Sequence, residues 1–292
     1  MVRISDKQIF GAQTQRIARA RVETSRLQAQ AASGQRVIRP SDDPGSFGRI
    51  AGLDHRLAAL EGTRQSAARV LSRFEVAEGA LGDMESVLER ARELTIGGLN
   101  GAQSAATRQS TAHEVRALRE HMLGLANTKV DGQFIFSGTR TDRPPLADDG
   151  TYQGGGAGSP VKIGVGSPID AAIDGQRFLA GGASVLQTLD RIVAALEGND
   201  PAALGQELDA LTGLEDQIID ARTDLGARIG RVRMSEALAE EVTFELTRQR
   251  AGEADADMAS VISQLVGQEQ ALQAAVQIAG RSMQTSLLDI LR

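Results

Sequence analysis

The sequence predicts a mainly α-helical protein with a small β-rich insertion, in which the two chain ends form a long helical coiled-coil bundle. Three observations indicate this fold class. Apolar residues recur at helical spacing through most of the 292 residues. Aromatic residues make up only 3% of the chain, and a core of Leu, Ile, Val, Ala and Met suits long, narrow bundles. Glycine is concentrated in one segment, because 10 of the 32 glycines lie between Gly150 and Gly182.

The first predicted helix ends near Ser33 and Gly34, since glycine commonly follows the last turn of a helix. Its apolar seam is weak, because small and polar residues occupy several positions. Such a helix depends on tertiary contacts more than on its own propensity. The seam consists of Phe10, Ile17, Ala20, Thr24, Leu27 and Ala31.

A second, long helix is predicted from Gly45 to about Gly97. The preceding Ser41-Asp42-Asp43-Pro44 offers side-chain oxygens that can cap it and a proline that fits its first turn. Polar residues interrupt one of its two apolar rows, which predicts a polar break in its packing. The interrupting residues are Arg64, Glu78 and Glu85.

A third helix is predicted from Ser104 to Lys129. Polar and apolar residues then alternate in Gly132–Thr139 and again in Val161–Val165, which is typical of strands. The glycine-rich stretch around the second of these segments is too rich in turns for a long helix. We therefore expect a β-rich insertion over residues 137–182.

Helical spacing resumes at about Ala183 and, after Asn199-Asp200-Pro201, continues to about Arg250. Gly252 is expected to interrupt this helix, and Asp255 or Asp257 can cap the next one.

The terminal helix carries the clearest pattern in the chain. Steps of four and three from Met258 give an apolar seam that only Glu269 and Ser286 interrupt. A seam this narrow is typical of a coiled coil, so it must pack against another helix. Whether that helix belongs to an ordinary hairpin in a monomer or to an assembly of copies is not decided by the spacing. The seam consists of Met258, Ile262, Leu265, Glu269, Leu272, Val276, Ala279, Met283, Ser286 and Ile290.

This order of elements predicts three domains, because the chain runs outward and then returns. Residues 1–40 and 253–292 form a discontinuous terminal coiled-coil domain. Residues 41–136 and 183–252 form a bundle of long helices. Residues 137–182 form the outward-facing insertion.

Composition and motifs exclude several classes of function. The net charge of −6 argues against a broad nucleic-acid footprint, and without cysteine there are no thiolate metal sites. No apolar stretch suggests a signal peptide or a membrane span, so neither membrane nor nucleic acid is an expected partner. His113-Glu114 lacks the second histidine of a zinc-protease motif, and the glycines at 154–158 lack the lysine of a phosphate loop. We expect no enzyme activity, cofactor or metal.

Three stretches together resemble the flagellin superfamily. Ser33–Pro44 (SGQRVIRPSDDP) resembles the segment that follows the first helix of its members. Glu253–Ala259 (EADADMA) resembles the acidic break before their terminal helix. Gln268–Ala274 (QEQALQA), with the ending Ser286–Leu291, resembles their C-terminal assembly helix.

Two further segments narrow this resemblance to the hook–filament junction proteins of the superfamily. Gly132–Thr139 (GQFIFSGT) is similar to a segment of those proteins, and Leu225–Arg231 is similar to their returning long helix. The resemblance is weakest over the glycine-rich middle.

The resemblance implies flagellin-like layered domains, with coiled-coil chain ends innermost and the β-rich domain outward. It implies a structural subunit between the hook-side junction protein and the first flagellin subunits. The implied partners are other copies of the chain in a ring or tube, the first hook-associated junction protein, flagellin and an export chaperone. The implied location is the bacterial flagellum, after export without a cleaved signal peptide.

Two sets of site residues follow. The segment from Arg36 to Pro44 is expected to act as a spoke between layers, with a plain helix start that has no interface role as the alternative. Its residues are Arg36, Pro40, Ser41, Asp42, Asp43 and Pro44. The expected assembly interface comprises Phe10, Ile17, Leu27, Ile262, Leu265, Leu272, Val276, Met283, Leu287 and Ile290.

Two alternative functions remain open. The chain can be a short flagellin that forms the filament itself, from which the segment 132–139 distinguishes it in part. It can also be a cytoplasmic coiled-coil scaffold, which would have stable terminal helices in solution.

Overall fold

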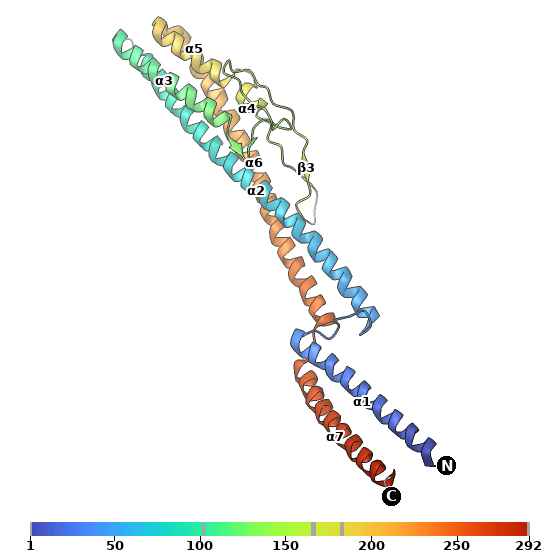
Figure 1. Cartoon of the computed structure of the whole chain (residues 1–292). Coiled ribbons are helices and arrows are strands. Elements are labelled where there is room, and N and C mark those ends of the chain that lie inside the picture. Colours follow the sequence, from blue (N-terminus) through green and yellow to red (C-terminus); the bar gives the residue numbers. More distant parts are fainter. Residues whose placement is uncertain (1, 101–102, 165–167, 182–183, 291–292) are drawn as a thin grey trace. The chain divides into compact units, whose positions relative to one another are not determined.

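The computed structural model describes residues 2–100, 103–164, 168–181 and 184–290, with side chains described from Gly11 to Arg281 within those ranges. The chain forms two compact units. The terminal unit comprises Met1–Ala59 and Val242–Arg292, and the middle unit comprises Leu60–Glu241. Helices α2 (Pro44–Gly98) and α6 (Pro201–Ala254) contribute residues to both units. The predicted mainly α-helical fold class is confirmed (Figure 1).

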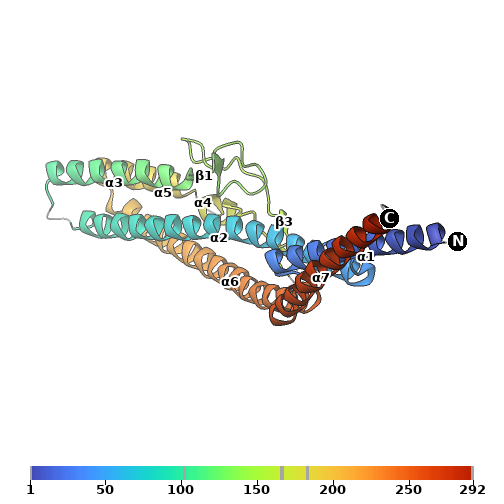
Figure 2. The same cartoon turned by 60° about the horizontal axis from the view of Figure 1, so that its bottom comes forward.

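The terminal unit is built from α1 (Val2–Ser33), α7 (Met258–Ile290) and the adjoining ends of α2 and α6. Helices α1 and α7 pack side by side and antiparallel, so the two chain termini are neighbours in both views (Figures 1 and 2). The chain ends therefore form the helix pair that their seams predict.

The predicted break at Gly252 is wrong, because α6 continues through Gly252 and ends at Ala254. No atom lies within 4 Å of the place where a Cβ of residue 252 would lie, so nothing around this glycine forces the helix to stop. The helix ends instead where Asp255 forms an isolated antiparallel bridge with Gln35.

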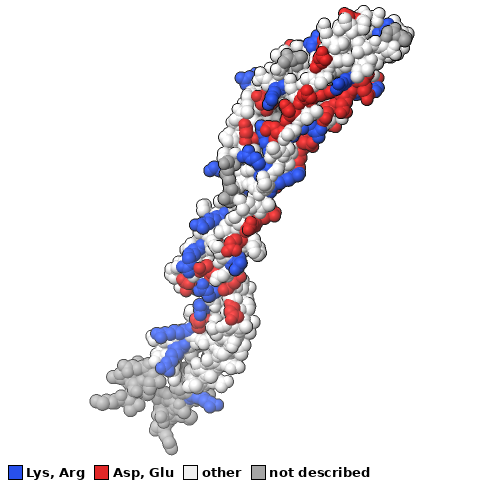
Figure 3. Space-filling model, turned by 180° about the vertical axis from the view of Figure 1, so that it is seen from behind, with Lys and Arg blue, Asp and Glu red and all other residues white. Residues whose placement is uncertain are grey.

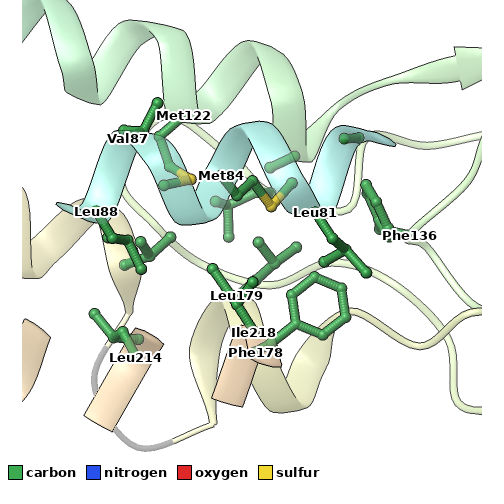
Figure 4. Close-up of a cluster of buried hydrophobic side chains, with 14 of the residues drawn as sticks. Leu81, Met84, Val87, Leu88, Met122, Phe136, Phe178, Leu179, Leu214 and Ile218 are labelled. Carbon is green, nitrogen blue, oxygen red and sulfur yellow. The ribbon is translucent and has the colours of Figure 1, made fainter. Parts of the chain in front are cut away.

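The middle unit holds the large hydrophobic core. Helices α3 (Ala105–Ala126) and α5 (Val185–Gly198) pack together beside α2 and α6. Figure 4 shows side chains of α2, α3 and α6 lying close to Phe136, Phe178 and Leu179 in this core. The rings of Phe136 and Phe178 meet edge to face, with their centroids 5.4 Å apart. Fully or almost fully buried residues include Phe74, Leu81, Met84, Leu88, Met122, Leu214 and Ile218.

The predicted polar break in α2 is a site of ion pairing. Arg222 of α6 pairs with both Glu78, at 2.7 Å, and Glu85. Hydrogen bonds to these two carboxylates raise the pKa of Arg222. Two of the three residues that interrupt the apolar row, Glu78 and Glu85, therefore tie α2 to α6.

The insertion contains less strand than its sequence pattern predicts. Strand β1 (Lys129–Val130) pairs with β2 (Gln133–Phe134), and β3 (Pro160–Val161) pairs with β4 (Ile169–Asp170), both antiparallel. Gly132 and Gly138 have φ angles of 78° and 61°, so the chain turns at both ends of the segment predicted as one strand. Helix α4 (Gln176–Ala180) ends the insertion. Val165 lies outside the described residues.

Tyr152 holds the insertion together. Its Oη lies 2.7 Å from Asp174 Oδ1 and 2.9 Å from the Phe136 carbonyl oxygen. Burial raises the pKa of Tyr152, and the neighbouring Asp174 raises it further. Further backbone hydrogen bonds join Gly155 to Ser137 and Thr139 to Gly156, so much of this segment is fixed without regular strands.

Candidate assembly surface at the two chain ends

The contact between α1 and α7 follows a heptad pattern on both helices. On α1, Leu27 and Thr24 are buried, at 2% and 7% exposure, and the other seam positions Ile17, Ala20 and Ala31 are half-buried. On α7, the buried and half-buried positions at this spacing are Val261, Leu265, Gln268, Leu272, Ala275 and Ala279. Gln28 Nε2 donates a hydrogen bond of 3.3 Å to Glu269 Oε1 across the pair.

The seam of α7 is offset from the predicted one, in which Met258, Ile262, Glu269 and Val276 held seam positions. Ile262 and Val276 remain 50% and 45% exposed, while their neighbours Val261 and Ala275 take the inner places. Both series of four-and-three steps are largely apolar, and both contain Leu265 and Leu272. Periodicity alone therefore does not choose between them.

Four predicted interface residues lie where side chains are not described. The backbones of α1 and α7 continue through these positions. The residues are Phe10, Met283, Leu287 and Ile290.

Helix α7 also carries large apolar side chains that stay partly exposed among the described residues. Met258, Ile262, Val266 and Val276 are 37–50% exposed and lie along one flank of the seam. On α1, Val22 is 70% exposed. A surface with this many exposed apolar side chains is characteristic of a protein–protein contact. Residue spacing does not distinguish a helix face that is buried within the chain from one that stays exposed.

The connection between α1 and α2 is fixed to the end of α6 by backbone pairing. Gly34 ends α1 with φ of 70°, the left-handed geometry that glycine adopts without strain. Arg36 N–H donates to the Ala254 carbonyl at 2.7 Å, and Ala256 N–H donates to the Gly34 carbonyl at 2.9 Å. Val37, Ile50 and Ala254 form a small buried cluster, with Phe47 packed against it.

Charged side chains surround this pairing. Arg49 makes two hydrogen bonds to the Glu253 carboxylate, at 2.9 and 3.0 Å. Arg36 donates to the Glu253 carbonyl at 2.9 Å and pairs with Asp43 at 3.3 Å. Ser46 lies between the two arginines and accepts a hydrogen bond from each.

The two aspartates of the connection have different roles. Asp43 caps α2, because its carboxylate accepts hydrogen bonds from Ser46 N–H at 3.0 Å and from Ser46 Oγ–H at 2.6 Å. These bonds, with the Arg36 guanidinium, lower the pKa of Asp43. Asp42 instead accepts from the N–H groups of Arg39 and Ile38, which lowers its pKa. Pro40 and Ser41 are exposed, and Pro44 is the first residue of α2.

Within the described part of the chain, no group of three or more His, Asp or Glu side chains is placed to hold a metal ion. None of the described helices is both long and apolar enough to cross a membrane.

Comparisons with known proteins agree with this architecture. A family model described as the bacterial flagellin N-terminal helical region matches residues 4–141. The flagellar hook-associated protein 3 of Escherichia coli K12 is 26% identical over 302 aligned residues, which cover 94% of this chain and 95% of that protein. The chain is therefore similar over nearly its whole length to a flagellar hook-associated protein, and its N-terminal part matches the flagellin family model.

Solved structures of the superfamily share this fold. A putative flagellar hook-associated protein of Vibrio parahaemolyticus aligns with a TM-score of 0.68 and 22% identity, over 73% of this chain and all of that one. The FlgL protein of Bacillus cereus aligns with a TM-score of 0.60 and 26% identity, over 68% of this chain and 99% of that one. The resemblance to flagellin-superfamily proteins that the sequence motifs indicate is thus confirmed.

Proposed function

We propose that this chain is a structural subunit of the bacterial flagellum that joins a hook-associated protein to the flagellin filament. The observation that carries the proposal is full-length similarity to hook-associated protein 3, whereas the similarity to the flagellin of Bacillus subtilis covers only 37% of this chain. The chain is a structural protein and not an enzyme, like the flagellar proteins that it matches.

The assembly surface in this proposal is the α1/α7 pair. Its seam gives each copy a defined helix pair, and its exposed apolar side chains are left for contacts with other copies. Burying one such side chain contributes about 1.5–3 kcal/mol. Each copy would gain this free energy only in a ring or tube, so assembly would also complete the ordering of the chain ends.

The segment from Arg36 to Pro44 is proposed as the spoke of the assembled subunit. Hydrogen bonds from Arg36 to the carbonyl oxygens of Ala254 and Glu253 join it to the end of α6. Replacing both Asp42 and Asp43 with Ala should reduce assembly more than it reduces the stability of the monomer. An equal effect on assembly and on monomer stability would indicate that the segment is only the start of a helix.

The remaining partners follow from the same proposal. They are the first hook-associated junction protein on one side, flagellin on the other, and a chaperone that covers the apolar surface of α7 before export. Export would proceed without a cleaved signal peptide.

Labelling isolated flagella with antibodies against the chain tests this function. We expect gold particles at a single position, between hook and filament, and filament loss when the gene is deleted. Labelling along the whole filament would identify a short flagellin instead. A chain found only inside the cell, in bacteria with normal filaments, would identify a scaffold.

A further inference from the structure

The open flank of α7 has a defined chemistry. It runs along Met258, Ile262, Val266, Glu269, Gln273 and Val276, which are three or four residues apart and so share one side of the helix. All but Glu269 are exposed. Glu269 is the one charged residue between Met258 and Gly280, and it forms no ion pair among the described residues.

Helix α1 carries a second stripe, on the side opposite its seam. Its members recur in steps of four and three, none is charged, and only Gln15 and Val22 are larger than serine. At 3.6 residues per turn, Val22 lies about 140° from Ile17 and about 160° from Thr24, so the stripe points away from α7. All seven members are exposed: Gly11, Gln15, Ala18, Val22, Ser25, Ala29 and Ala32.

Cations border this stripe. Arg16, Arg19 and Arg21 are exposed and form no ion pair among the described residues. In the space-filling view, the surface next to the grey chain ends is mostly white with scattered blue side chains (Figure 3). The large apolar side chains of α7, and its one carboxylate, which accepts a hydrogen bond from Gln28 but pairs with no described cation, therefore complement the small residues and the arginines of α1.

We infer that the open flank of α7 packs on the outer stripe of α1 in the next copy of the chain. The two surfaces are different, so the contact is heterologous and each copy uses both. Repetition of such a contact generates a ring or a helical tube, whereas a contact of α7 with itself would stop at a dimer. This inference rests on the proposed function and adds the identity and polarity of the contact.

The absence of cysteine allows a direct test. Val22→Cys and Val266→Cys chains, each with its own epitope tag, are produced together in the flagellated bacterium, and isolated flagella are mildly oxidised. A disulfide requires Cα atoms within about 7 Å, so a mixed dimer reports direct contact. We expect a product that carries both tags, and no dimer from either chain alone. Ala29→Cys with Ile262→Cys is a second pair, chosen for a different axial offset between copies.

Two controls accompany the pairs. Gln28→Cys with Glu269→Cys in one chain is the control for pairing within a copy, because these positions face each other across α1 and α7; any disulfide it forms should be intramolecular. Ala274→Cys, which is exposed on the other flank of α7, should not react with Val22→Cys.

The outcomes separate this inference from the proposed function. Dimers of Val266→Cys alone, or disulfides to another flagellar protein, would overturn the inference. So would a chain that gold labelling places at the junction but that gives no mixed product from either pair. A chain absent from the junction would overturn the proposed function, whatever the disulfides show.

Discussion

At the scale of single residues, exposure distinguishes the apolar side chains of α1 that stabilise the folded chain from those that remain open to another molecule. Leu27 is 2% exposed in the α1/α7 seam, whereas Val22, five residues earlier, is 70% exposed. Leu27 therefore contributes to the stability of the folded chain, whereas Val22 would be buried only in contact with another molecule.

Leu27→Ala is therefore expected to destabilise the terminal unit by about 2–5 kcal/mol, because it removes a buried side chain and leaves a cavity. Val22→Ala should change stability by less than about 0.5 kcal/mol. Chemical unfolding followed by circular dichroism measures both. Equal effects of the two substitutions would contradict the packing of α1 on α7.

The carboxylates around the connection predict an acid-sensitive contact. The pKa values of Asp42, Asp43 and Glu253 are lowered in the folded chain, mainly by hydrogen bonds and also by the positive charges of nearby arginines. A lowered folded pKa contributes stability above the unfolded pKa of about 4, and this contribution is lost as the pH falls through the folded pKa.

Asp43→Asn isolates part of this effect, since Asn caps a helix as well as Asp does but does not pair with Arg36. The melting temperature of the wild type should exceed that of Asp43→Asn near neutral pH, and the gap should shrink as the pH is lowered below about 4. Asp43→Ala, which also loses the cap, should melt below Asp43→Asn at every pH. A gap that is independent of pH would rule out the Arg36–Asp43 pair as its origin.

At the scale of elements, two glycines of the terminal unit have opposite roles. Gly34 ends α1 at φ of 70°, whereas Gly252 lies inside α6, and the Cβ of an alanine would meet no atom within 4 Å at either position. The difference between the two positions is therefore one of backbone conformation alone.

Gly34→Ala should destabilise the chain by about 1 kcal/mol, because alanine disfavours the left-handed conformation. Gly252→Ala should stabilise it by about 0.5–1 kcal/mol, because alanine is the better helix former. Unfolding free energies of the two variants give the comparison. Destabilisation by Gly252→Ala would mean that α6 does break there, as the sequence had suggested.

At the scale of the whole molecule, the two units differ in how much apolar surface they bury. The middle unit contains the main core, whereas the terminal unit has the α1/α7 seam and one small cluster. Regions with few buried apolar contacts open at lower free energy than a well-packed core.

Native-state hydrogen exchange on the purified monomer should therefore be fast in 2–30 and 258–290 and slow in the core segments of the middle unit. Protection of both terminal segments should rise when copies associate. Strong protection at both ends in the monomer would favour the self-contained scaffold.

The sequence by itself determined the order of the long helices, the pairing of the chain ends and the resemblance to the flagellin superfamily, because heptad spacing, capping residues and short motifs can be read locally. The tertiary structure decided between alternatives that local patterns allow equally. Two overlapping apolar series run along α7, and packing on α1 selected Val261 over Ile262. Likewise, Gly252 and the alternating residues 132–139 allow more than one backbone, and pairing of Asp255 with Gln35 and turns at Gly132 and Gly138 selected among them. Contacts between residues distant in sequence supply the free-energy differences that spacing does not contain.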